Sequence, residues 1–483
     1  MTDGVRGARC MVATGHPLAA DAAHRMLRSG GSAVDAAIAA DAVLGVVEPM
    51  ATGIGGDLLA MLVRPEGGAE SYNGTGRAPA AFHPGLLDTL PEGRIPQRHP
   101  LSVTTPGAVQ GWWDLHRAHG RLDWAHLLMP AMQVARNGFA VAPVAAREWA
   151  LFEPVLRQDP ACAALYRAGG VPKAGERFAN PALSDVLAAI AREGPDAFYR
   201  GMPAQAAAAA VQGMGGVLDA ADFVAHRGNF CEPLSQGFRD LQVLACPPNT
   251  HGMAVLDALA RLDGLPLAAS DPQVFVQAVG AMGAAMRRAK ETVADPAGNT
   301  VCTVVVDADG LAISLMSSIF KRFGSGIAVP GCGFVLQNRG FGFSAPGHIN
   351  GPAPGKRPYH TVVPGAALKD GRFYAAFGVV GGAMQPQGQV QLLLRIAAWG
   401  EAPQAALDAP RWRLESDTAL AIEAGMPSPV VEALRAAGYT DPVGSGELGG
   451  RSDFGGAQWV MRDVDGGLIG ASDKRKDGLA RSE

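Results

Sequence analysis

The spacing of apolar and polar residues divides the chain into a first part rich in helices and a second part rich in strands. In the first part, apolar residues recur at helical intervals, and Ser32 stands where an N-cap would begin the second helix. This pattern predicts helices over 17–27, 33–47, 182–191 and 203–212. Two short segments bounded by glycine, 58–63 and 70–73, predict a pair of strands.

From residue 300 onward the pattern changes to short runs with strand character. The predicted strands are 301–306, 312–316, 334–336, 361–363, 373–377, 457–461 and 467–470, and one helix is predicted over 387–399. Alternating helical and stranded layers are typical of an α/β sandwich rather than of separate modules.

Composition narrows the class of partner. Of the 483 residues, 48% are hydrophobic, enough for a large core. The 41 Lys and Arg nearly balance the 45 Asp and Glu, and no run of like charge suggests a nucleic-acid or membrane tail. The first residues also lack the apolar stretch of a secretory signal. We therefore expect a cytoplasmic protein without nucleic-acid or membrane partners, whose partners are small molecules or another protein subunit, with a homo-oligomer left open.

Several motif matches carry no chemistry. The six cysteines lack CxxC pairing, which argues against a zinc site or a disulfide framework and favours buried thiols. His251 and His360 lack the HExxH spacing of a metal site. Residues 444–449 match GxGxxG, but no helical pattern follows, so we interpret them as a loop. The pair Trp112 and Trp113 lies in a helical pattern and predicts packing rather than ligand stacking.

The stretch from Asn299 to Gly310 carries the main chemical hypothesis. Polar residues begin this stretch and an apolar strand follows them. Thr300 is the second residue of the stretch. If the peptide bond before Thr300 breaks, the threonine hydroxyl becomes a nucleophile and its own amine the base. Most threonines at a strand edge only satisfy a turn or suit β geometry, so the local sequence leaves both interpretations open.

A series of short motifs in one order strengthens the first interpretation. They are Gly30–Ala37 (GGSAVDAA), Gly53–Asp57 (GIGGD), Pro106–Gly111 (PGAVQG), Pro354–Pro358 (PGKRP) and Ser472–Gly478 (SDKRKDG). With these motifs the chain resembles the gamma-glutamyltranspeptidase family of N-terminal-nucleophile hydrolases over nearly its whole length. The resemblance implies one four-layer αββα unit over 1–483. It also implies cleavage into a large chain, 1–299, and a small chain, 300–483, which stay associated.

The same resemblance assigns catalytic roles. Thr300 corresponds to the family's nucleophile, and Ser318 to a second hydroxyl that hydrogen-bonds it. Gly381 and Gly382 correspond to the glycine pair whose backbone amides form the oxyanion hole. A glycine pair suits this role because backbone N–H groups can then approach a tetrahedral oxyanion closely. No metal or organic cofactor is implied.

The departures from the family pattern fall on the substrate pocket. Thr75 stands where transpeptidases have the Arg that binds the glutamyl carboxylate, and Arg77 lies two positions further on. His360 and Thr361 replace a Ser-Ser pair, and Phe320 replaces an Asn. A site that leaves polar ends of a glutamyl group unpaired would lose about 1 to 3 kcal/mol for each. Glutathione is therefore expected to be a poor substrate.

Two segments, 73–79 and 336–340, look like those of a divergent branch that includes acylases and oxamate amidohydrolases. The second contains Asn338 and Arg339, which we include among the substrate-binding candidates. Phe320 favours a small or apolar acyl group, whereas Arg77, Arg339 and His360 could hold a carboxylate. The resemblance thus implies an autoprocessing threonine amidohydrolase or acylase acting on a small amide.

Two alternatives stay open at this point. One is a true gamma-glutamyltransferase or glutathione hydrolase. The other is an unprocessed, inactive binding protein of the same fold, because the segment 294–299 before Thr300 is much shorter than in typical relatives.

Overall fold

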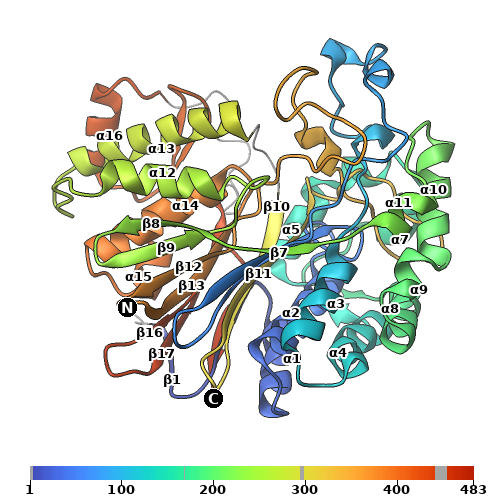
Figure 1. Ribbon diagram of the computed structural model, residues 1–483, viewed down its shortest axis with the longest axis horizontal. Coiled ribbons are helices and arrows are strands. Elements are labelled where there is room, and N and C mark those ends of the chain that lie inside the picture. Colours follow the sequence, from blue (N-terminus) through green and yellow to red (C-terminus); the bar gives the residue numbers. More distant parts are fainter. Residues whose placement is uncertain (1–3, 168, 294–298, 441–453, 483) are drawn as a thin grey trace.

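The computed structural model describes residues 4–167, 169–293, 299–440 and 454–482. Two seven-stranded antiparallel sheets face each other, and helices cover the outer side of each (Figure 1). The predicted αββα sandwich is confirmed. The short segment 294–298 and the glycine-rich match at 444–449 lie outside the described residues.

The first sheet, called here the β10 sheet, carries the candidate nucleophile in one of its interior strands. Its spatial order is β18 (Leu479–Ser482), β2 (Met11–Thr14), β10 (Asn299–Val306), β11 (Ala312–Phe320), β3 (Asp57–Val63), β4 (Ala69–Asn73) and β7 (Asn229–Cys231). β10 therefore pairs with β2 on one side and with β11 on the other.

The second sheet, called the β13 sheet, carries the glycine pair at the end of its central strand. Its order is β1 (Val5–Gly7), β17 (Leu468–Ser472), β16 (Gly456–Arg462), β13 (Arg372–Val380), β12 (Gly365–Lys369), β9 (Leu241–Ala245) and β8 (Leu234–Phe238). Two-stranded ribbons complete the described strands: β5 (Phe139–Ala140) with β6 (Arg177–Phe178), and β14 (Trp412–Leu414) with β15 (Leu420–Ile422).

Successive side chains of β10 alternate between the two faces of its sheet, and each face packs against a different layer. Cys302, Val304 and Val306 belong to the cluster between the two sheets. Val301 and Val305 belong to the cluster under the outer helices. Because side chains of a strand alternate between its faces, a strand buried on both sides reads as a continuous apolar run.

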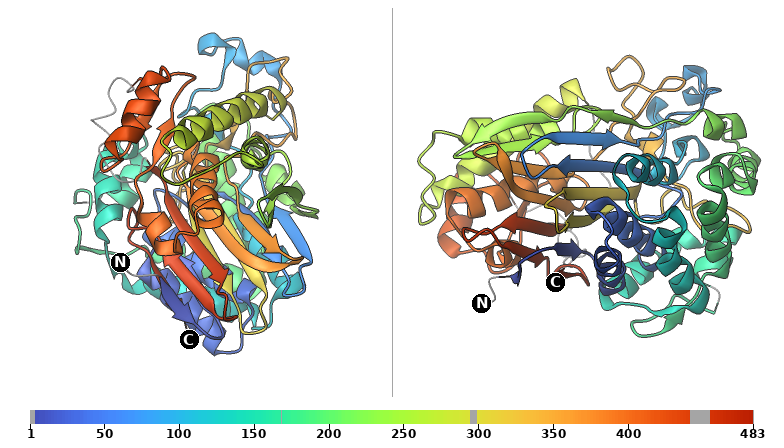
Figure 2. Two further views of the ribbon diagram at one scale, coloured as in Figure 1. Left: turned by 90° about the vertical axis from the view of Figure 1, so that its left-hand side faces the viewer. Right: turned by 60° about the horizontal axis from the view of Figure 1, so that its bottom comes forward.

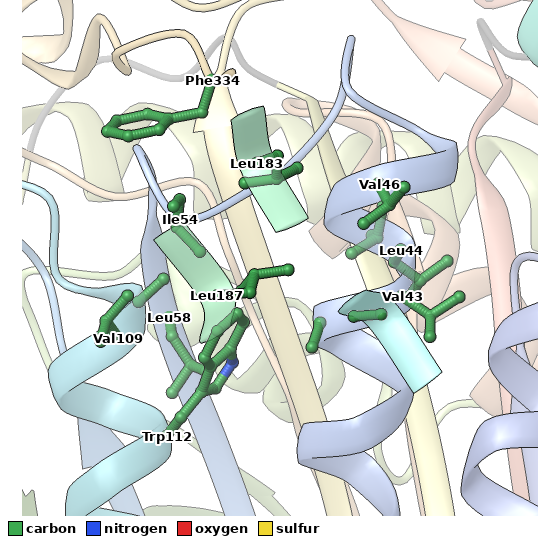
Figure 3. Packing of buried hydrophobic residues seen from close by; sticks show 14 of the residues in the cluster. Val43, Leu44, Val46, Ile54, Leu58, Val109, Trp112, Leu183, Leu187 and Phe334 are labelled. Carbon is green, nitrogen blue, oxygen red and sulfur yellow. The ribbon is translucent and has the colours of Figure 1, made fainter. Parts of the chain in front are cut away.

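The helices over the β10 sheet come from the first half of the chain (Figures 1 and 2). They are α1 (Pro17–Arg28), α2 (Ala33–Val47), α3 (Ala108–His119), α4 (Trp124–Asn137), α5 (Pro143–Leu151), α6 (Glu153–Leu156), α7 (Pro160–Tyr166), α8 (Pro181–Glu193), α9 (Asp196–Tyr199), α10 (Met202–Gly213) and α11 (Ala220–Ala225). All of α2 is buried, and Ser32 closes a capping box with Asp35 at its start. Figure 3 shows Val43 and Leu44 of α2 in the same cluster as Trp112 of α3 and Leu187 of α8.

The helices over the β13 sheet form a separate outer layer with its own core. They are α12 (Gly252–Leu262), α13 (Gln273–Thr292), α14 (Met384–Leu393), α15 (Pro403–Asp408) and α16 (Ser428–Ala436), and a π-helical turn, Leu394–Ala398, continues α14. Short 3₁₀ turns lie at Pro84–Leu87, Pro91–Gly93, Pro100–Ser102 and Arg339–Gly342.

Most predicted elements are confirmed, but two predicted strands are wrong. Residues 334–336 form only an isolated bridge, because their backbone pairs within the loop, where the Leu336 amide donates to the Ile327 carbonyl. Residues 361–363 form no strand either, since side chains of α14 occupy both backbone groups of Val363. The packing prediction for Trp112 is confirmed, because it is buried and donates to Asp41. Cys231 is half-buried and the other cysteines are buried; all are free thiols.

Candidate active site

Thr300 lies at an irregularity near the start of β10. Asn299 pairs with Phe320 and Val301 with Ser317, so Thr300 falls inside a bulge of the β10–β11 ladder, opposite Ser318 and Ile319. Bulges re-aim side chains and are frequent beside active sites. The Thr300 side chain is fully buried, and its Oγ1 accepts a hydrogen bond of 2.7 Å from Nε2 of Gln385.

Ser318 stands on the strand next to Thr300. Its Oγ accepts the backbone N–H of Phe320 at 2.8 Å and an N–H of Arg339, from Nη2, at 3.0 Å. The register places Ser318 opposite Thr300, and the hydrogen bond that the resemblance implies between them stays a prediction. The Ser318 hydroxyl is thus buried and held by a guanidinium group, on the strand that pairs with that of the candidate nucleophile.

Gly381 and Gly382 form the turn between β13 and α14. Both have positive φ, 115° and 63°, which residues with a side chain rarely adopt. The Gly382 carbonyl accepts the N–H of Gln385 at 3.0 Å. Since Gln385 holds Thr300, the glycine turn is tied by one helical turn to the residue that contacts the candidate nucleophile.

Arg339 occupies the centre of the candidate substrate site and is fully buried. Its Nη1 donates to Thr361 Oγ1 at 3.4 Å, and its guanidinium carbon lies 4.3 Å from the ring centroid of Phe320. Phe320 in turn packs against Phe341, with 6.1 Å between ring centroids. The structure therefore gathers Arg339, Thr361, Phe320 and Ser318 into one cluster.

The electrostatics of this cluster depend on Asp57, the first residue of β3. Its Oδ2 lies 3.7 Å from Arg339 Nε and 3.4 Å from His360 Nε2, and all three residues are fully buried. Burial raises the pKa of Asp57, while the Arg339 cation opposes that rise. Burial also lowers the pKa of Arg339 to about 9, and Asp57 partly counters this shift.

His360 is a neutral member of the same cluster. Its Nδ1 accepts the backbone N–H of Val362 at 3.2 Å, so the ring proton belongs on Nε2, which faces Asp57. Burial and the nearby Arg339 lower the pKa of His360 well below its usual range. His360 can donate one hydrogen bond but is not a cation here.

Three other predicted residues lie outside this cluster's contacts. Thr75 is buried and its Oγ1 accepts from Asn249 at 3.4 Å. Arg77 is exposed and donates to the Gly355 carbonyl at 3.1 Å. Asn338 bridges two loops, donating to the Gln97 carbonyl at 2.7 Å and accepting from the backbone of Lys321 at 3.1 Å.

Sequence reasoning did not select Asp57 or Gln385 as site residues. Asp57 appeared only as the last residue of a family motif. Gln385 had a visible signal, because α14 places glutamine at four alternate positions, Gln385, Gln387, Gln389 and Gln391, in an otherwise apolar stretch. All four are buried, and a buried amide must find polar partners.

In the described residues, no group of three or more His, Cys, Asp and Glu side chains could hold a metal ion. Among the same residues, no helix is long and apolar enough to cross a membrane.

Two facing antiparallel sheets between helical layers define the class: this is the fold of N-terminal-nucleophile hydrolases. A profile of the gamma-glutamyltranspeptidase family matches residues 19–301 and 284–482, and the chain belongs to that family. It is 33% identical to the oxamate amidohydrolase proenzyme of Klebsiella pneumoniae, over 97% of this chain and 98% of that one. It is 32% identical to the glutathione hydrolase-like YwrD proenzyme of Bacillus subtilis, over 99% of both.

Comparison with solved structures agrees with the sequence comparisons. The crystal structure of a cephalosporin acylase from Bacillus halodurans superposes with a TM-score of 0.93, at 32% identity, over 100% of this chain and 97% of that one. The similar proteins thus include amide hydrolases and acylases, several of them named as proenzymes.

Proposed function

We propose that this chain is an autoprocessing amide hydrolase in which Thr300 is the nucleophile of both self-cleavage and turnover. The observation that carries the proposal is the placement of the Thr300 hydroxyl, buried in a strand bulge and held by the residue that follows the glycine turn. Membership of a family with relatives named as proenzymes supports it.

In this proposal, self-cleavage proceeds as an acyl shift. Thr300 Oγ forms a bond to the carbonyl carbon of Asn299, and the C–N bond to Thr300 breaks. The hydroxyl proton ends on the released nitrogen, which becomes a free amine. Water then hydrolyses the ester, leaving a carboxylate on Asn299 and restoring the hydroxyl. During each attack, the amides of Gly381 and Gly382 would stabilise the oxyanion.

Turnover repeats these steps on an external amide. The Thr300 amine takes the hydroxyl proton and passes it to the leaving nitrogen, while Oγ carries the acyl group as an ester. Water releases the acid. The cut leaves the fold intact, because 1–299 and 300–483 each contribute strands to both sheets.

The substrate is a small amide rather than glutathione. Thr75 offers no cation where transpeptidases hold the glutamyl carboxylate, and Phe320 and Phe341 wall the site with apolar surface. Arg339, which donates to Ser318 on the strand beside Thr300, is the residue we assign to a carboxylate close to the scissile bond. Oxamate, on which a similar protein acts by name, carries such a carboxylate.

Turnover of oxamate and of glutathione tests this proposal. We expect the purified protein to release ammonium from oxamate, to act poorly on glutathione, and to lose activity in Thr300→Ala. Thr303→Ala is the matched control, because Thr303 is a buried threonine of the same strand whose hydroxyl binds only Thr14 in the described contacts, at 2.8 Å. Equal activity of wild type and Thr300→Ala would refute the assignment of the nucleophile.

A further inference from the structure

The amide of Gln385 is oriented by its two partners. Its Oε1 accepts the backbone N–H of Val363 at 3.0 Å, and its Nε2 lies 2.7 Å from Thr300 Oγ1. A backbone N–H can only donate, so the amide oxygen must face Val363 and the NH₂ group must face Thr300. Thr300 Oγ therefore receives a hydrogen bond from Gln385, and its own proton is left for a different acceptor.

A second glutamine fixes the partner that orients the first. Gln389 lies one helical turn after Gln385 on the same side of α14, and its Nε2 donates to the Val363 carbonyl at 2.6 Å. Both backbone groups of Val363 are thus held by one helix. This clamp fixes the distance between α14 and the segment that carries His360 and Thr361.

We propose that Gln385 is a further catalytic residue, donating a hydrogen bond to the Thr300 oxygen while it loses its proton, and that Gln389 is a positioning residue acting through Val363. The inference rests on the proposed function, because it takes Thr300 as the nucleophile. Negative charge grows on Oγ as its proton leaves, and a preorganised donor in a buried site stabilises such charge. Gln385 keeps both of its own protons; the Thr300 proton still ends on the nitrogen of the broken C–N bond.

The same helix supplies a matched control. Gln391 is a buried glutamine of α14 that also holds both backbone groups of one residue, accepting from Trp412 N–H and donating to its carbonyl, each at 3.0 Å. Trp412 belongs to β14, and Gln391 makes no described contact with Thr300. Gln391→Met therefore removes the same kind of bonds from the same helix without touching the nucleophile.

The test follows self-cleavage of the full chain during cell-free synthesis, sampled over time by gel and intact mass. Gln385→Met should slow cleavage by about 10- to 100-fold, the effect of losing one hydrogen bond to a developing charge. Gln389→Met should slow cleavage less, by about 3- to 10-fold, because Gln389 acts only by positioning Val363, the residue that orients Gln385. Gln391→Met should cleave at the wild-type rate, while the thermal unfolding midpoint falls similarly in all three. Cleavage by Gln385→Met at the wild-type rate, or equal slowing in Gln391→Met, would overturn the inference.

Gln385→Glu tests the donor role even if the methionine variant does not fold. Its carboxyl can still accept from Val363, but it donates to Thr300 only when protonated. Cleavage should approach the wild-type rate at low pH and decline as the pH rises through the pKa of the new carboxyl. A rate that instead rises with pH would contradict a donor at this position. A wild-type chain that stays uncut, or Thr300→Ala that still cleaves, would refute the proposed function itself.

Discussion

The glycine turn between β13 and α14 depends on single residues with unusual backbone angles. Gly381 has φ of 115°, and a Cβ added there would lie 3.0 Å from the Cα of Gly455. Gly381→Ala should therefore displace the turn and lower the kcat for oxamate by about 100-fold, as loss of an oxyanion donor does. Gly371→Ala is the control, because Gly371 also has positive φ but open space around it. Unchanged turnover in Gly381→Ala would argue against an oxyanion hole at this turn.

Asp41 makes stability depend on pH. It accepts hydrogen bonds from Ser317 and Trp112 under the β10 sheet, and burial raises its pKa from 3.8 to about 6. The native state then binds the proton more tightly than the unfolded state, so the stabilisation present at low pH is lost as pH rises from about 4 to about 6.

Asp41→Asn cannot titrate and should lack this dependence. The free energy of unfolding of Asp41 protein relative to Asp41→Asn should fall by on the order of 3 kcal/mol between pH 4 and pH 7. Denaturant unfolding of both forms in the uncut Thr300→Ala background measures it. A difference that is the same at the two pH values would show that Asp41 does not titrate in this window.

At the scale of elements, the sequence predicts those whose partners are their neighbours along the chain. Ser32 marks the start of α2, and two short segments separated by a glycine-containing turn predict β3 and β4; all three elements are confirmed. The wrong strand at 361–363 is instructive, because its residues are buried and suit β geometry. The hydrogen bonds that a strand would give to a sheet go here to Gln385 and Gln389 of α14, a tertiary choice that a local pattern does not contain.

The residues of the candidate site also divide into those that local sequence motifs predict and those that only the fold distinguishes. Thr300, Ser318 and the glycine pair were found through motifs, and the structure places the first two beside each other and the pair next to Gln385. The sequence offers Arg77, Arg339 and His360 as candidates for holding a carboxylate. Burial separates the two arginines: Arg339 is enclosed beside Ser318, whereas Arg77 is exposed.

At the scale of the whole molecule, the two predicted chains are interleaved. In the β10 sheet, β2 of the large chain lies between β18 and β10 of the small chain. Buried ion pairs also join the two predicted chains. Glu148 of the large chain contacts Arg322 and Lys476 of the small chain, at 2.5 Å and 3.6 Å. Separating the chains would leave edges unpaired in both sheets and buried charges without partners.

The fragments should therefore elute together in size-exclusion chromatography, even in about 1 M NaCl, because salt screens buried pairs little. They should separate in denaturant. Elution as two separate species in native buffer would contradict the interleaved arrangement of the cut protein.

The central claim is that Thr300 becomes the first residue of a new chain, and the intact mass of purified protein tests it most directly. We expect two species, the second beginning with Thr300 by N-terminal sequencing and ending at Glu483, and one uncut species in Thr300→Ala. A wild-type chain that stays whole, or a cut at another bond that persists in Thr300→Ala, would contradict the account.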